Sequence, residues 1–317
     1  MPNPADPNYN SRAGFDPSFL GVPAPLPRLR AQVRARAFEV PGAASGSELE
    51  LKYHHFSVIL NREARLAFVA AVNFDAGAEF HYTRTGSDRW WPDPRVDQAL
   101  QAGNEFYSDN PLDRGHLVRR TDAAWGSTEE EARFGNDDTF HFTNCSPQHE
   151  IYNQARRAAK QGLLLWGNIE EHVAAQAAAT RGAAAHGRRT DGAGASGQRL
   201  SIFNGPVFRA TDRLHRGLAI PREYWKLIVY RTSDDPPAIR AAAFVLSQES
   251  LIANLPLEEF VAGPYRPYQV AVREIEARTG LDFDVVRSVD ALAARAGGAL
   301  ESRVAPRAIE SLGDIVL

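Results

Sequence analysis

The chain has 317 residues, of which 44% are hydrophobic and 24% are charged, with a net charge of −3 and a single cysteine. This composition is that of an ordinary globular protein with a sizeable core, and one cysteine excludes an intramolecular disulfide and a cysteine-based zinc site. The slightly acidic balance argues weakly against nucleic-acid binding through a broad basic surface, but not against an enzyme that binds phosphates with a few arginines.

The sequence gives no sign of a membrane span or of an N-terminal signal peptide. No apolar run is long enough to span a bilayer, so we expect no membrane partner. Residues 1–10 are polar and rich in proline and asparagine, without the basic and then apolar order of a signal peptide. We expect a cytoplasmic location by default, with a secreted effector as the alternative.

The first half of the chain predicts an arm followed by a β-rich domain. Residues 1–48 are rich in proline, glycine and alanine, and we expect them to form an N-terminal arm that wraps the domain. The main domain is predicted over residues 49–290. Two β-rich runs, 56–60 and 66–72, predict a hairpin that turns at 61–65, and a further short strand is predicted over 140–144.

The second half predicts alternating helices and strands. Helices are expected over 148–180, 256–262 and 267–279, the last ending at Gly280, and strands over 199–208, 224–230 and 241–246. An alanine- and glycine-rich stretch at about 174–198 predicts a flexible surface loop, and residues 291–317 form a C-terminal tail. Because the elements show no βαβ rhythm, the pattern favours an α+β domain with a mainly antiparallel sheet.

One block of polar residues has the chemistry that phosphodiester hydrolysis requires. The reaction needs a base for water, a cation beside the phosphate, and donors for the developing negative charge. His116 titrates near neutral pH and can be the base, and Arg114 presents a planar fork of donors suited to phosphate oxygens. Asn153 offers a neutral oxygen of the kind that Mg²⁺ accepts while it keeps most of its waters.

Three segments in this order carry a family resemblance: Asp-Arg-Gly-His at 113–116, Asn-x-x-Pro-Gln at 144–148, and Asn-Gln at 153–154. Together they resemble the DNA/RNA non-specific endonuclease family, the ββα-metal nucleases that include mitochondrial endonuclease G. The resemblance extends over about residues 51–283. It implies a ββα-metal fold, with a central, mainly antiparallel sheet flanked by helices, and sequence-independent hydrolysis of DNA and RNA with Mg²⁺, or Mn²⁺, as the cofactor.

The resemblance also implies roles for individual residues. His116 would be the general base, Asn153 the direct protein ligand of the metal, and Asn144 a support for the histidine and its hairpin. Arg114 would bind phosphate. A second phosphate-binding arginine from upstream is best matched by Arg89, with Arg84 as the alternative.

One part of the family pattern fits poorly. Family members place a glutamate, which binds a metal-bound water, soon after the metal-binding asparagine; here Glu170 is the match, 17 residues after Asn153. A straight helix would separate the two by roughly 25 Å. We therefore expect a break in the helix, for which Gly162 is the best candidate. The alternative is that Glu171 or Glu150 binds the metal-bound water instead.

Several residues near the block have less certain roles. Trp90 and Trp91 could stack bases, but packing is favoured for bulky aromatic residues. The adjacent His54 and His55 would point to opposite faces of a strand, which favours structural roles. Cys145 is expected to be a small core residue rather than a reactive thiol.

Rival functions remain open at this point. They are a phosphodiesterase for a small nucleotide or lipid, and a nucleic-acid-binding module without catalysis; the sequence lacks the Gly-x-Ser-x-Gly of a serine hydrolase. Beyond DNA and RNA substrates, the family resemblance leaves open a homodimer and an inhibitory or activating protein partner.

Overall fold

The computed structural model describes residues 8–43, 48–83, 88–153, 168–169, 172–173, 175, 199–232, 238–252, 267–297 and 304–317. The predicted helix at 256–262 lies outside these residues. So do nearly all of the predicted loop at 174–198 and most of the predicted helix at 148–180. No helix in the described part of the chain combines the length and apolar character that a bilayer crossing needs.

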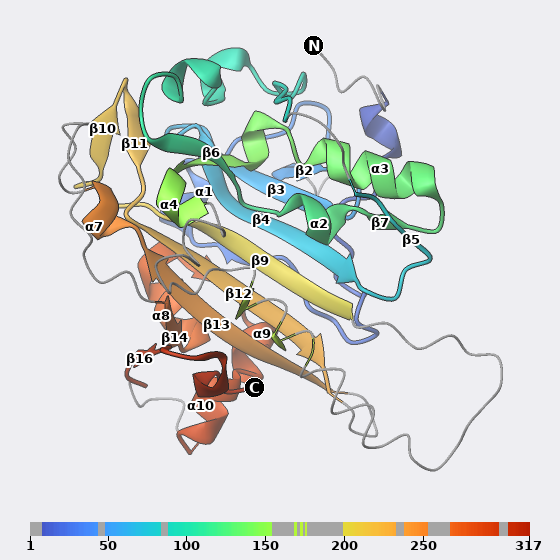
Figure 1. The fold of residues 1–317 in the computed structure, drawn as a ribbon, viewed down its shortest axis with the longest axis vertical. Helices are drawn as coiled ribbons and strands as arrows, with labels where there is room; N and C mark the ends of the chain where they lie inside the picture. Colours follow the sequence, from blue (N-terminus) through green and yellow to red (C-terminus); the bar gives the residue numbers. More distant parts are fainter. Residues whose placement is uncertain are drawn as a thin grey trace.

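Eight strands form one antiparallel sheet through the middle of the molecule (Figure 1). Its long strands confirm the predicted hairpin and the predicted strands near 199, 224 and 241, each to within three residues at either end. In spatial order the strands are β16 (Arg307–Ala308), β14 (Pro267–Val270), β13 (Ile239–Ser247), β12 (Glu223–Arg231), β9 (Arg199–Val207), β4 (Leu66–Asp75), β3 (Phe56–Asn61) and β2 (Glu50–Lys52).

The side chain of Asn61 stabilises the turn between β3 and β4. The side-chain oxygen of Asn61 accepts hydrogen bonds from the backbone of Glu63 and Ala64, at 3.1 and 3.2 Å. Arg65 closes the turn in the left-handed region, with φ of 57°. Side-chain capping of this kind explains why a turn without glycine forms at the predicted place.

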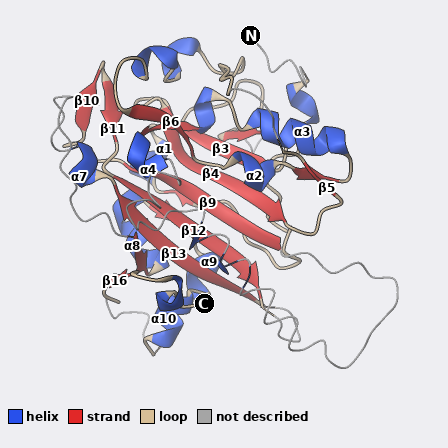
Figure 2. Cartoon of the chain, viewed as in Figure 1, coloured by secondary structure: helices blue, strands red, loops and turns tan. Residues whose placement is uncertain are grey.

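Both faces of the sheet are covered, and Figure 2 shows helices on either side of it. One face packs under the elements around 112–153, with Val58, Ile202 and Phe244 in its core. The other face packs against the N-terminal arm and the helices α8 (Val272–Thr279) and α9 (Val285–Ser288), with Phe203 and Leu227 in its core. Burial of both faces of the sheet explains why the sequences of the long strands are nearly continuous runs of apolar residues.

The remaining elements are short and cover the sheet. In chain order they are η1 (Tyr9–Ser11), β1 (Arg28–Leu29), α1 (Ala31–Arg34), β5 (Phe80–His81), η2 (Gln98–Leu100), η3 (Asn104–Phe106), β6 (Leu112–His116), α2 (Arg120–Ala123), β7 (Trp125–Gly126), α3 (Glu129–Asp138), η4 (Phe142–Asn144), β8 (Cys145–His149), α4 (Glu150–Asn153), β10 (Arg213–His215), β11 (Leu218–Ile220), α7 (Glu249–Ile252), β15 (Leu281–Asp282), α10 (Ala291–Arg295) and η5 (Leu312–Asp314).

Three local predictions were wrong. Residues 140–144 form turns and η4 rather than a strand, because backbone groups in this segment bond to others three residues away, as from Asn144 to His141. The predicted helix at 148 begins only at Glu150, because 148 and 149 complete strand β8. Residues 267–270 form β14, paired with β13 and β16, and the helix begins at Val272, whose amide donates to Asp290 at 2.7 Å.

Candidate active site

The polar block folds into a small unit on one face of the sheet. Strand β6 pairs antiparallel with β8, so that Arg114 lies opposite Pro147 and His116 opposite Cys145, and α4 follows β8 directly. In Figure 1 β6 and α4 lie beside the upper strands of the sheet, near β3 and β4, while α8 and α10 lie toward its lower end, near β14 and β16. Two strands and a helix therefore bring the predicted histidine, arginine and asparagines together, although 37 positions separate 116 from 153 along the chain.

Buried polar side chains fix β8 to the sheet below it. Gln248 accepts from the His149 amide at 2.8 Å and donates to the Pro147 carbonyl at 3.1 Å. The Tyr224 hydroxyl also donates to that carbonyl, at 2.7 Å. Gln248 directly follows the end of β13 and Tyr224 lies at the start of β12, so these two neighbouring sheet strands set the position of the hairpin.

Asn144 connects the two strands of the hairpin at their closed end. Its side chain is fully buried, accepts from the Val118 amide at 2.9 Å and donates to the carbonyls of Val118 and Thr139 at 3.0 and 2.9 Å. These three bonds satisfy the amide and fix the segment that follows His116.

Two aromatic rings surround the His116 imidazole. The Trp90 ring centroid lies 4.5 Å from that of His116, and the Phe140 ring meets it edge-on at 4.9 Å. Trp90 is buried, so its role is packing, as favoured from sequence, rather than base stacking. Sequence reasoning missed Phe140 as a neighbour of the site; its place two residues after the end of α3, just before the Asn-x-x-Pro-Gln segment, was the only signal.

Of the two predicted phosphate-binding arginines, Arg114 is half-buried and Arg89 is exposed. The Arg114 guanidinium donates to the Asn104 side chain at 2.8 Å, which orients it without an acidic partner at that contact. Arg89 is exposed and lies over the Trp91 ring, with 4.5 Å between its guanidinium carbon and the ring centroid. The alternative, Arg84, lies outside the described residues.

Asn153 ends α4 at the surface and suits a hard cation. Its side-chain nitrogen donates to Asp113 at 3.1 Å, which leaves the carbonyl oxygen of the amide as the atom for a metal ligand bond. Glu150 begins the same helix three residues earlier, on the same side. Glu170, Glu171 and the predicted break at Gly162 lie outside the described residues.

The donor set distinguishes between metals. Within the described ranges, no three histidine, cysteine or carboxylate side chains lie together as a metal-binding group. A closed zinc site needs such a group, whereas Mg²⁺ is held through one or two oxygen ligands and its own waters. The Asn153 amide and the Glu150 carboxylate, both in α4, offer oxygen atoms, which are the ligand type that Mg²⁺ takes.

Cys145 is structural. The thiol is fully buried, lies 3.2 Å from the Tyr107 hydroxyl, and has its pKa raised to about 12 by burial. It is protonated at neutral pH and cannot act as a nucleophile there. His54 and His55 are also structural: His54 contacts Asp138 at 2.7 Å, and His55 stacks on Trp125.

Comparison with known proteins identifies the family and the fold of the chain. A family model described as DNA/RNA non-specific endonuclease matches residues 34–289, which confirms the resemblance predicted from the motifs. A chain in the crystal structure of the EndoG/EndoGI complex is similar with a TM-score of 0.53 and 16% identity, over 82% of this chain and 94% of that one. This likeness confirms the predicted α+β fold.

Two curated relatives are longer than this chain. An uncharacterized protein, y4fB, of Sinorhizobium fredii is 35% identical over 97% of this chain and 43% of its own length. A protein named Nuclease from Nostoc sp. is 26% identical over 60% of this chain and 58% of its own length. The chain thus spans about half the length of these relatives.

Proposed function

The chain belongs to the DNA/RNA non-specific endonuclease family, and on that premise we propose that it cleaves phosphodiester bonds in both DNA and RNA with little regard to sequence. The observation that carries the proposal is the β6–β8–α4 unit, which brings His116, Arg114 and Asn153 onto one hairpin and its helix. The sequence offers no zinc finger, recognition helix or RNA-binding motif that would read bases, which supports sequence-independent cleavage.

In the proposed mechanism His116 is the general base. A ring nitrogen takes a proton from water, the water oxygen bonds to phosphorus, and the bond from phosphorus to the leaving oxygen breaks. The leaving oxygen keeps the electron pair of that bond and takes a proton from solvent water. Arg114 and Arg89 would donate to the phosphate oxygens, and Asn144 and the two aromatic rings would keep the imidazole oriented. When bound, a divalent cation adds charge stabilisation at the phosphate.

We propose that this cation is Mg²⁺, or Mn²⁺, with the side-chain oxygen of Asn153 as its direct protein ligand. Glu170 would bind a metal-bound water, with Glu150 as its substitute because it lies one turn before Asn153 in α4. The hydrogen bond from the Asn153 amide nitrogen to Asp113 supports the first assignment, since it points the amide nitrogen away from a cation.

Cleavage of supercoiled plasmid and of a long RNA, each with Mg²⁺ and with EDTA, tests the activity. We expect a smear of fragments from both substrates with Mg²⁺ and none with EDTA. His116→Ala should lower the rate at least about a hundredfold. His81→Ala, at an exposed histidine in the short strand β5, is the matched control and should cleave at the wild-type rate.

Four outcomes would count against the proposal: near-normal cleavage by His116→Ala, discrete bands at limiting enzyme, DNA or RNA binding without cleavage, and faster hydrolysis of a small phosphodiester than of plasmid. The third would favour the binding module and the fourth the small-substrate phosphodiesterase.

Binding of Mn²⁺ followed by electron paramagnetic resonance tests the metal site without reference to activity. Asn153→Ala should weaken binding, whereas Asn153→Asp, which retains an oxygen ligand, should bind at least as tightly as the wild type. Equal Mn²⁺ affinity in wild type and Asn153→Ala would place the metal elsewhere.

A further inference from the structure

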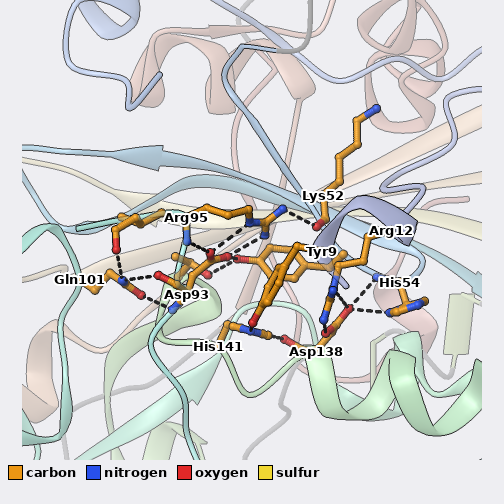
Figure 3. A network of polar contacts seen from close by, with 12 residues as sticks. Tyr9, Arg12, Lys52, His54, Asp93, Arg95, Gln101, Asp138 and His141 are labelled. Carbon is orange, nitrogen blue, oxygen red and sulfur yellow. Dashed lines mark hydrogen bonds and ion pairs between the residues drawn. The ribbon is translucent and has the colours of Figure 1, made fainter. Parts of the chain in front are cut away.

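Tyr9 and Arg12, among the first described residues of the chain, contact His141 and Asp138 in the segment before β8 (Figure 3). We propose that this N-terminal clasp, residues 8–12, positions His116 through the segment 138–144, with Arg12 and Tyr9 as its positioning residues. The proposal rests on the role of His116 proposed above. It assigns a function to an arm whose purpose the sequence left open.

Arg12 makes the strongest contact of the clasp. Its guanidinium donates two parallel hydrogen bonds to Asp138, both 2.8 Å long, and neither side chain is exposed to solvent (0% for each). The same carboxylate accepts from the backbone amide of His54 at 2.9 Å and from its ring Nδ1 at 2.7 Å. These partners hold the pKa of Asp138 well below its usual range, so the carboxylate stays charged.

Tyr9 makes the second contact, three residues further along the same segment. Its hydroxyl lies 2.6 Å from Nε2 of His141, and Nδ1 of that ring lies 2.7 Å from the Asp138 carbonyl. The carbonyl can only accept, so Nδ1 donates, and burial lowers the pKa of His141 and keeps Nε2 as an acceptor for the tyrosine hydroxyl.

Two guanidinium groups fix the Tyr9 ring itself. The carbon of the Arg12 guanidinium lies 3.8 Å from the ring centroid and that of Arg95 lies 4.7 Å from it. Arg95 is in turn bound to Asp93, at 2.7 Å. Arg12, which is buried, and Tyr9, which is half-buried, are therefore part of a larger polar network that includes Asp93 and Arg95.

The clasped segment leads to the catalytic histidine. Its two anchored residues, Asp138 and His141, lie on either side of Phe140, whose ring meets His116 edge-on at 4.9 Å. The segment ends at Asn144, whose side chain fixes the backbone of Val118, two residues after His116. A shift of the segment would move both the aromatic wall and this support.

The chemistry of the clasp suits positioning better than bulk stability. A buried ion pair adds little net stability, because apolar residues of similar volume often stabilise a protein as well. The planar guanidinium of Arg12, however, can bind the Asp138 carboxylate through two hydrogen bonds in only one geometry. The sheet cores take their apolar residues from elsewhere in the chain, since no residue of 8–12 belongs to them. The clasp therefore acts on the geometry of one segment.

Tyr9→Phe and Arg12→Lys test the proposal in the full-length protein, with Arg28→Ala as the matched control. Arg28 is an exposed arginine of the same arm, 69% exposed at its side chain, and pairs only at the surface with Asp282 and Asp284. At a temperature where circular dichroism shows each variant folded, we expect kcat on plasmid to fall about threefold to tenfold in Tyr9→Phe and Arg12→Lys, with KM unchanged. Arg28→Ala should match the wild type.

A double variant separates positioning from a general structural effect. If the clasp acts through Phe140, adding Tyr9→Phe to Phe140→Leu should lower kcat less than Tyr9→Phe does alone. Any of three results would overturn the proposed positioning role of the clasp. They are a wild-type kcat in folded Tyr9→Phe and Arg12→Lys, a change in KM alone, and full additivity of Tyr9→Phe with Phe140→Leu. Should Arg12→Lys fail to fold, Tyr9→Phe alone decides. A wild-type protein that does not cleave, or an active His116→Ala, would instead overturn the proposed function on which the clasp rests.

Discussion

The eight-stranded sheet and the β6–β8 hairpin are both antiparallel, yet different forces hold them. The sheet is held by long backbone ladders and by apolar side chains packed on both faces. The hairpin has one short ladder of five residue pairs, and buried amides and hydroxyls from Asn144, Gln248 and Tyr224 fix its position.

This difference separates stability from function. Apolar packing is tolerant of shape as long as volume is conserved, whereas a hydrogen-bonded side chain has one correct geometry. We therefore expect substitutions in the sheet to lower stability while activity per folded molecule is retained. Substitutions in the hairpin should lower activity even where the protein stays folded.

Phe203→Ala should give the largest loss of stability. Phe203 lies in the central strand β9, is fully buried on the face opposite the hairpin, and packs against Phe15 and Phe283. Loss of a buried phenylalanine lowers the free energy of unfolding by about 3 to 5 kcal/mol. Urea unfolding measures this loss, and nuclease activity per folded molecule should be unchanged.

Phe203→Leu conserves most of the volume and is the control, with a loss of roughly 1 kcal/mol. If Phe203→Ala reduced activity per folded molecule as much as it reduced stability, the separation between the two regions would be wrong.

Asn144→Ala should affect both quantities. It leaves the Val118 amide and two buried carbonyls without their partner, and each unsatisfied group costs about 1 to 3 kcal/mol unless water reaches it. We expect a loss of about 3 kcal/mol in the free energy of unfolding, together with a fall in kcat that persists at temperatures where the variant is fully folded.

Asn144→Asp keeps the acceptor for Val118 but replaces the donor with a negative charge facing two carbonyls, so it should be no more active than Asn144→Ala. Wild-type kcat in folded Asn144→Ala would show that this amide serves the fold alone.

Gly115→Ala should act through a steric clash inside the hairpin. A Cβ at Gly115 would lie 2.2 Å from the Gln148 side chain, which is itself buried. Overpacking of this kind costs about 1 to 3 kcal/mol, and the adjacent His116 should shift with the strand. Plasmid cleavage and thermal unfolding measure the two effects.

The double variant Gly115→Ala with Gln148→Ala removes the clashing side chain and should recover part of the lost activity. An absence of any recovery would mean that the glycine is required for another reason.

The sequence could predict those features that depend on contacts between residues close together along the chain. The long strands were predictable from local apolar runs, and the histidine and asparagines of the hairpin and α4 only from the family resemblance of three short motif segments, since 28 positions separate His116 from Asn144. The segments 140–144 and 267–270 were assigned wrongly because local composition does not show which strand or turn partner is available. The Arg12 contact with Asp138 spans 126 positions and the Tyr9 contact with His141 spans 132, so no local pattern could show them.

The smallest effect concerns acid, which should act on His55, a histidine between β2 and β3 that stacks on Trp125, and not on the apolar packing of the sheet. Burial lowers the pKa of His55 from 6.5 to about 4. The unfolded chain therefore binds a proton at higher pH than the folded chain does, so stability is complete above pH 6.5 and is lost as the pH falls toward 4. Between pH 7 and 5.5 we expect a loss of about 1 kcal/mol from this residue, measured by urea unfolding. Asparagine tolerates the left-handed backbone at this position, where φ is 66°, so His55→Asn is the variant of choice. It should flatten the dependence of the free energy of unfolding on pH. An unchanged dependence would assign the acid sensitivity to His141, whose pKa is also lowered by burial.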